Sequence, residues 1–161
     1  MKRILNLCLL LLALPVFHLN SQTLPIEAFA SIPDVSDLTL SPDGKNIASV
    51  VKLTSTKEQG TLVTLTNVDS QKQILVAKTD NQKFTVQGLS WASNDMLFIY
   101  AKFPATRNGT PVSEYRLFKY SISKGDLSSV IKPMVLKRFK WVPQIQSDII
   151  DILKGDDDHL L

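Results

Sequence analysis

Residues 38–51 read LTLSPDGKNIASVV, and this stretch decides the fold class. Two short apolar runs flank three turn-forming residues, Pro42, Asp43 and Gly44. Pro42 presets the backbone φ angle of a turn, Asp43 can accept hydrogen bonds from nearby amides, and Gly44 tolerates positive φ. The stretch therefore predicts two strands joined by a tight turn.

A second hairpin is predicted directly after the first. Residues 61–68 alternate around Val63 and Leu65, residues 69–72 supply a turn, and residues 73–77 lead back. The two hairpins together make one four-stranded unit.

The same plan recurs about 50 residues later, which is the length of one repeat in several repeat architectures. Its strands and turns are expected at residues 88–91, 93–95, 96–101, 115–122, 123–126 and 127–131. A third unit is expected to open at Phe139-Lys140-Trp141 and to continue through residues 149–153. Because Trp91 and Trp141 then fall at the same place in successive units, we interpret both as packing residues rather than as an aromatic binding surface.

Helical periodicity is confined to the short segment 26–30. The predicted class is therefore all-β, with four-stranded antiparallel blades of a β-propeller that form an incomplete ring.

The first residues have the layout of a signal peptide. Lys2 and Arg3 precede an apolar run from Ile4 to Phe17, which is shorter than the about 20 residues of a membrane span. We therefore expect a signal-peptide helix in residues 1–22, with cleavage near Ser21, an uncleaved membrane anchor being the alternative. A lead-in segment with a short helical turn is expected at 23–34, and the propeller portion, about two blades and part of a third, at 35–161.

Cysteine content agrees with export to the periplasm or the medium, and the charge argues against a nucleic-acid partner. The single cysteine, Cys8, lies in the apolar run, and the residues before it do not favour lipidation. Removing Lys2 and Arg3 takes the 18 basic residues to 16 against 15 acidic ones, a net charge of +1. The remaining basic residues are scattered, and the group at 137–140 is interpreted as the solvated side of a strand, so no nucleic-acid partner is expected. No membrane attachment is expected after signal cleavage.

An ordered series of motifs resembles a known family. The Ser-Pro-Asp-Gly turn resembles the blade motif of TolB-type propellers. The longer series resembles exported bacterial peptidases of the prolyl oligopeptidase family, of the dipeptidyl-aminopeptidase and acylaminoacyl-peptidase type. The matching stretches are residues 24–30, 32–35, 41–44, 91–95, 109–111, 114–117, 143–144 and 156–159.

The resemblance implies a two-part enzyme, with an N-terminal propeller that filters peptide substrates and a C-terminal α/β-hydrolase domain that carries a Ser-Asp-His triad. This chain departs from that pattern, because none of its six glycines is placed to form the Gly-x-Ser-x-Gly elbow of the nucleophile. No catalytic residue is therefore assigned, no cofactor is expected, and the chain is predicted to be inactive alone.

Two segments carry candidate site residues. Residues 103–114 are expected to form a long loop, in which Arg107 is a candidate substrate contact and Asn108 fits a glycosylation acceptor. His159 follows three aspartates, but adjacent residues of an extended chain point to opposite sides, so a polar turn is favoured over a metal site.

Two functions from different classes remain open. The first is the non-catalytic N-terminal propeller piece of a serine peptidase that ends early. The second is a free-standing exported module that binds a protein or peptide without enzymatic activity. In either case, unpaired blade edges are expected to promote self-association.

Overall fold

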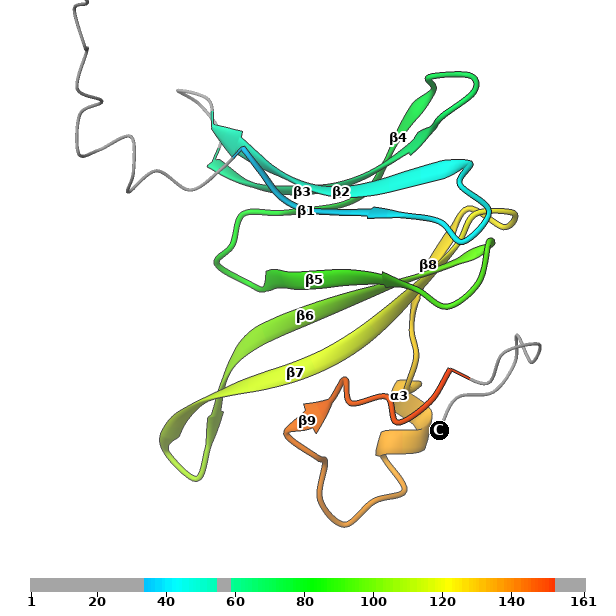
Figure 1. Cartoon of the computed structure of the whole chain (residues 1–161). Coiled ribbons are helices and arrows are strands. Elements are labelled where there is room, and N and C mark those ends of the chain that lie inside the picture. Colours follow the sequence, from blue (N-terminus) through cyan, green and yellow to red (C-terminus); the bar gives the residue numbers. More distant parts are fainter. Residues whose placement is uncertain (1–33, 55–58, 153–161) are drawn as a thin grey trace, which may run out of the picture. The chain divides into compact units, whose positions relative to one another are not determined.

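The computed structural model describes residues 34–54 and 59–152. The predicted signal peptide and nearly all of the lead-in segment lie outside these ranges, as does His159. The described residues form nine strands and one short helix, so the all-β class is confirmed (Figure 1).

Sheet A is a four-stranded antiparallel sheet whose strands follow one another in chain order. Its strands are β1 (Val35–Leu40), β2 (Asn46–Thr54), β3 (Gln59–Asn67) and β4 (Gln73–Thr79). The predicted turn between β1 and β2 is confirmed. Gly44 has φ of 74°, Ser41 Oγ donates to Asp43 Oδ1 at 2.6 Å, and the amide of Asn46 donates to Ser41 Oγ at 2.9 Å.

The β3–β4 hairpin also turns where the sequence predicts. Asn67 Oδ1 accepts hydrogen bonds from the amide and the hydroxyl of Ser70, at 2.9 and 2.8 Å, and Gln71 takes a positive φ of 58°. Asparagine stabilises such turns because its short side chain reaches backbone amides a few residues ahead.

Sheet B repeats this plan. Its meander is formed by β5 (Thr85–Trp91), β6 (Met96–Arg107), β7 (Thr110–Ser121) and β8 (Asp126–Ser129). The Asp95 carboxylate, in the β5–β6 turn, accepts hydrogen bonds from the hydroxyl of Ser121 at 2.7 Å and from the amide of Ser123 at 2.7 Å. It therefore ties this turn to the β7–β8 turn.

The expected long loop at residues 103–114 is wrong. β6 and β7 continue through it and close at the two-residue turn Asn108-Gly109, whose φ angles of 50° and 80° suit a tight hairpin. Counted along the ladder from the closing pair Arg107–Thr110, Pro111 belongs to the first following pair and Pro104 to the third. These are non-hydrogen-bonded pairs of the ladder, so the missing proline N–H groups are not needed there.

The core lies between the inner faces of the two sheets. It is formed by Ala48, Val63 and Leu65 of sheet A and by Leu97, Ile99 and Tyr120 of sheet B. Trp91 packs against this cluster, as predicted, and its Nε1 donates to the carbonyl of Thr39 at 3.3 Å.

β1 and β5 are joined by a further bond, in which the amide of Leu89 donates to Asp37 Oδ2 at 2.8 Å. The first strands of the two sheets are thereby held together.

The expected strand at residues 139–141 is not formed. After sheet B come the short helix α3 (Pro133–Leu136), an irregular stretch, and the two-residue strand β9 (Ile145–Gln146), which pairs with β7 in parallel. Pro133 starts the helical turn, and Pro143 restricts the residue before it, so little chain is left for a strand between them. Trp141 is 70% exposed, and its predicted role as a packing residue is wrong.

Candidate functional site

Arg107, the candidate substrate contact, lies at the end of β6 beside the hairpin turn. Its side chain reaches back along the hairpin to Glu114 on β7. Arg107 Nε and Nη2 both donate to Glu114 Oε1, at 3.2 and 2.8 Å. The contact is a fork of two charge-assisted hydrogen bonds, which fixes the guanidinium plane.

Arg116 completes the cluster from the other side. Residues two apart on a strand share one face, so Glu114 and Arg116 lie side by side on β7. Arg116 Nη2 donates to Glu114 Oε2 at 3.0 Å, and each oxygen of the carboxylate therefore has its own arginine. The hydrogen bonds from Arg116 and Arg107 hold the pKa of Glu114 below its usual value, although burial acts in the opposite direction.

The aromatic ring of Phe103 packs against Arg116 of this cluster. The Arg116 guanidinium carbon lies 4.6 Å from the centre of the Phe103 ring, within the range of a cation–π contact. Phe103 in turn stacks on Phe84 at 5.4 Å and contacts Phe118 at 6.1 Å between ring centres. Arg116 Nε is buried and lacks a hydrogen-bond partner within the described residues.

Arg107 also fixes the segment that follows α3. Its Nη1 donates to the carbonyl of Val142 at 2.8 Å. The amide of Tyr115 donates to the carbonyl of Gln144 at 2.9 Å, and Gln144 Nε2 donates to the carbonyl of Ser113 at 2.8 Å. These bonds hold β9 along the edge of β7, so Arg107 has a structural role that the sequence did not reveal.

The chemistry available to this cluster is recognition rather than proton transfer. Two guanidinium groups face one carboxylate, which leaves a local excess of one positive charge. A carboxylate with a lowered pKa is a weak base at neutral pH, so Glu114 is poorly suited to general base catalysis. Arg107 uses three of its five N–H groups in the contacts above, and its role as a substrate contact stays a prediction.

Three serines at or beside the predicted turns, Ser41, Ser90 and Ser93, make structural hydrogen bonds within turns and between strands. Ser41 bonds to Asp43 within its turn, Ser90 Oγ lies 3.2 Å from the hydroxyl of Tyr100, and Ser93 Oγ accepts the amide of Asp95 at 3.3 Å. Between residues 34 and 152, leaving out 55–58, no three His, Cys, Asp or Glu side chains are grouped to hold a metal ion. The segment 156–159 lies outside the described residues.

Glu114 and Arg116 were missed as site residues by the sequence reading. One signal was present, since Glu114-Tyr115-Arg116 places opposite charges two residues apart, on one face of any strand. Their link to Arg107 depends on the hairpin register, which follows only once Asn108-Gly109 is recognised as the turn.

No protein-family model, no curated protein and no solved structure matches the chain. The helical part of the described chain contains no segment long and apolar enough to cross a membrane.

Proposed function

We propose that sheets A and B are two consecutive blades of a β-propeller, and that this propeller is the non-catalytic part of an exported serine peptidase resembling the prolyl oligopeptidase family. One observation carries the proposal: the β1–β2 hairpin of sheet A bears apolar side chains on both of its faces, although only one face packs against sheet B. An antiparallel sheet with one solvated face alternates apolar and polar residues instead.

The two sheets share the pairing register of their strands as well as the order of the strands. The first hairpin of each sheet pairs equivalent residues, and β1 and β5 both skip one residue at the same point, at Ser36 and at Gln87. The equivalent pairs are Leu40–Ile47 with Trp91–Leu97, Leu38–Ser49 with Leu89–Ile99, and Val35–Val51 with Val86–Ala101.

In sheet B these positions form the face that packs against sheet A. In sheet A the same positions point away from sheet B, because Ala48 lies in the core and Ile47 and Ser49 alternate with it. Leu38 and Leu40 are consequently 63% and 54% exposed. Sheet A therefore has a face suited to packing, and no other sheet of the described residues lies against it.

The two polar residues at the centre of this outer face bond to each other. Ser49 and Thr64 are buried at its centre, and their hydroxyls lie 2.9 Å apart in a hydrogen bond. Another sheet can therefore cover the centre of the face without leaving these two hydroxyls unpaired. Stacking of like sheets on both sides of each blade is the arrangement of a propeller, where radial repetition also protects the sheet edges.

The peptidase part of the proposal is supported by the ordered sequence motifs. In the family that they resemble, the propeller admits peptides and a separate domain hydrolyses them. The described residues then contribute substrate filtering, and Arg107, with two N–H groups outside its structural contacts, is the proposed peptide contact.

The proposal is tested by comparing the purified chain with the product of the reading frame continued beyond Leu161. We expect the 161-residue chain to release no amine from aminoacyl or dipeptidyl chromogenic substrates and to resist a fluorophosphonate probe. The continued frame should add further four-stranded repeats and a Gly-x-Ser-x-Gly elbow, and its product should label and turn over substrate.

Two outcomes oppose the proposal. Stoichiometric labelling of one serine in the 161-residue chain would show that a nucleophile is already present. A true stop codon with a stable, inactive exported product supports the free-standing binding module instead.

A further inference from the structure

Residues 132–141 form a surface segment that is both basic and apolar. Lys132, Lys137, Arg138 and Lys140 are exposed, and no acidic residue occurs between Asp126 and Asp148. The apolar side chains of the same segment are exposed as well, and they are Met134, Val135, Phe139 and Trp141.

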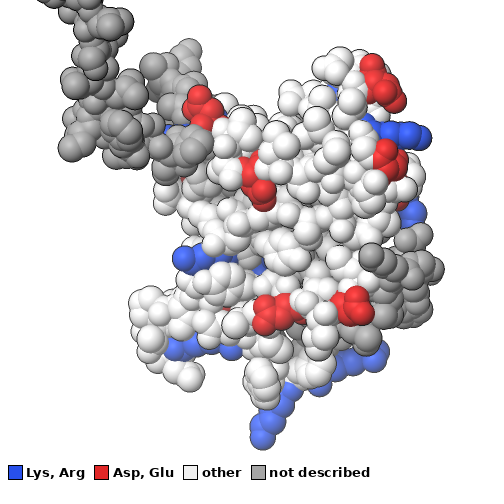
Figure 2. Space-filling view, viewed as in Figure 1, with Lys and Arg blue, Asp and Glu red and all other residues white. Residues whose placement is uncertain are grey.

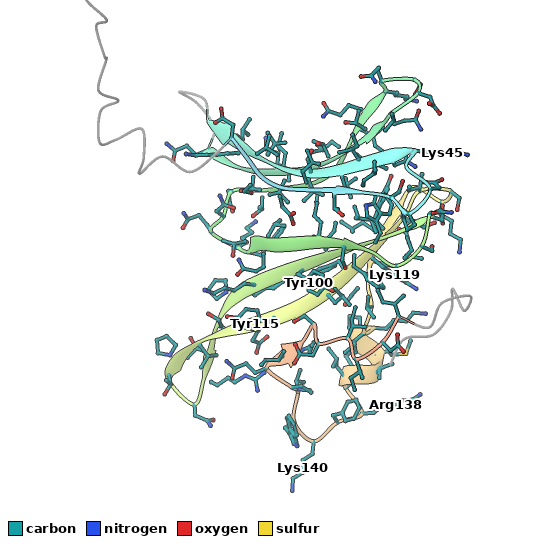
Figure 3. The ribbon with its side chains drawn as sticks, viewed as in Figure 1. Lys45, Tyr100, Tyr115, Lys119, Arg138 and Lys140 are labelled. Atoms are coloured by element: carbon teal, nitrogen blue, oxygen red, sulfur yellow. The ribbon has the colours of Figure 1, made fainter. Side chains whose placement is uncertain are left out.

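The positive charge projects from one end of the described chain. Figure 3 shows Arg138 and Lys140 pointing away from the sheets, with Lys140 at the lower end of the view. In Figure 2 basic side chains project at the same end, and the acidic side chains visible in this view lie above them. The basic and the apolar side chains of residues 132–141 are therefore exposed together and can contact the same binding partner.

We infer that this segment, named the basic-apolar segment, docks on an anionic lipid surface. Aromatic side chains such as Trp141 and Phe139 favour the interface between headgroups and acyl chains, and Met134 adds an aliphatic contact. Lysine and arginine at the same depth are attracted to anionic headgroups. The contact is peripheral, it replaces the expectation that the mature chain has no membrane attachment, and it is independent of the propeller proposal.

Other occupants fit this segment less well. Nucleic acid would use the basic groups and stack on the aromatic rings, but it gives Met134 and Val135 no apolar surroundings. A second copy of the same segment would bring four more positive charges to the contact. An anionic membrane satisfies both properties of the segment.

Tryptophan fluorescence of the full chain reports this contact locally. The chain has two tryptophans, of which Trp91 is half-buried in the core and Trp141 is exposed. With vesicles of phosphatidylglycerol we expect a blue shift of the emission and quenching by brominated acyl chains. Vesicles of phosphatidylcholine should give a far smaller response. Because the apolar N-terminal run contains no tryptophan, its own insertion does not produce the signal.

Three variants make the test specific. Trp141→Phe should abolish the response while leaving the emission of Trp91. A triple variant, Lys137→Gln, Arg138→Gln and Lys140→Gln, should weaken the response at low salt by roughly 100-fold in lipid concentration, since each basic residue near an anionic surface contributes about equally. The matched control, in which exposed Lys45, Lys72 and Lys83 become Gln, should respond like the unmodified chain.

The inference is overturned by any of three results. The first is an unchanged Trp141 emission with anionic vesicles. The second is an equal emission change of the two triple variants with phosphatidylglycerol vesicles, and the third is an equal emission change of the unmodified chain with the two lipids. A larger emission change with single-stranded DNA than with phosphatidylglycerol would assign the segment to nucleic acid instead.

Discussion

Leu38 and Leu89 occupy the same place in sheets A and B, yet Leu89 packs against the core and Leu38 is largely exposed. The same contrast holds for Leu40 and Trp91. Since register, strand order and bulge are shared, the difference comes only from the neighbour that each face has. Sheet B has sheet A against this face, and sheet A has no equivalent layer among the described residues.

The largest expected effect is the difference in lost stability between alanine substitutions at Leu97 and at Ile47, its equivalent in sheet A. Leu97 is 0% exposed in the core, so Leu97→Ala should lower the free energy of unfolding by about 3 kcal/mol through lost burial and a residual cavity. Ile47 is only half-buried, and Ile47→Ala should lower it by less than about 1 kcal/mol. Urea denaturation at low protein concentration measures both. Equal losses would mean that the outer face of sheet A is already covered.

A smaller effect is expected at Trp91. Trp91→Phe keeps an aromatic ring in the core but removes the hydrogen bond to the carbonyl of Thr39, which should lower the free energy of unfolding by about 1 kcal/mol. Trp141→Phe removes an exposed ring and should change it by less than about 0.5 kcal/mol. If thermal or urea unfolding ranks the two variants the other way, the assignment of Trp91 to the junction between the sheets is wrong.

The smallest effect concerns the turn carboxylates. Burial opposes ionisation of Asp95, but hydrogen bonds from Ser121 and Ser123 outweigh it and lower its pKa. A pKa lower in the folded than in the unfolded chain stabilises the fold above the unfolded value near 3.8, and this stability is lost as the pH falls through the folded value. Asp95→Asn should therefore reduce the loss of stability on acidification below about pH 4.

Asp43, in the equivalent turn of sheet A, gives the comparison. Its pKa is also lowered, by the hydrogen bond from Ser41 and then by the amide of Lys45, but both partners belong to its own turn. Asp43→Asn should accordingly have the smaller effect on unfolding between pH 2 and 5, because no second hairpin depends on it. A larger effect at Asp43 would show that the link from Asp95 to the β7–β8 turn contributes little.

Turn chemistry made much of the fold predictable. Pro42, Asp43 and Gly44 fix one hairpin, and residues 69–72 and 123–126 fix two others, because these residue types favour particular backbone angles locally. The same reasoning failed at Pro104 and Pro111, which resemble loop residues until the hairpin register shows that their N–H groups are not needed. It failed again at Trp141, where spacing alone suggested a third unit.

The candidate site was predictable only in part. Arg107 stood out by its position, but its partners depend on pairing across the hairpin and on the segment that returns to Val142. Such long-range pairing is set by tertiary packing, which local residue preferences do not contain. The shared bulge at Ser36 and Gln87 is equally invisible in the letters, and it is the feature that establishes the repeat.

The central claim is that the outer face of sheet A is built to pack against another sheet. Sedimentation velocity of the chain without residues 1–22, over about a hundredfold range of concentration, tests it most directly. We expect concentration-dependent association, which the double variant Leu38→Lys and Leu75→Lys should suppress, because both side chains are exposed on this face. The same substitutions at exposed Val135 and Ile150, outside the sheet, should not suppress it. A monomer with a sharp unfolding transition that does not depend on concentration would show that these two sheets are a complete domain, and the propeller account would fail.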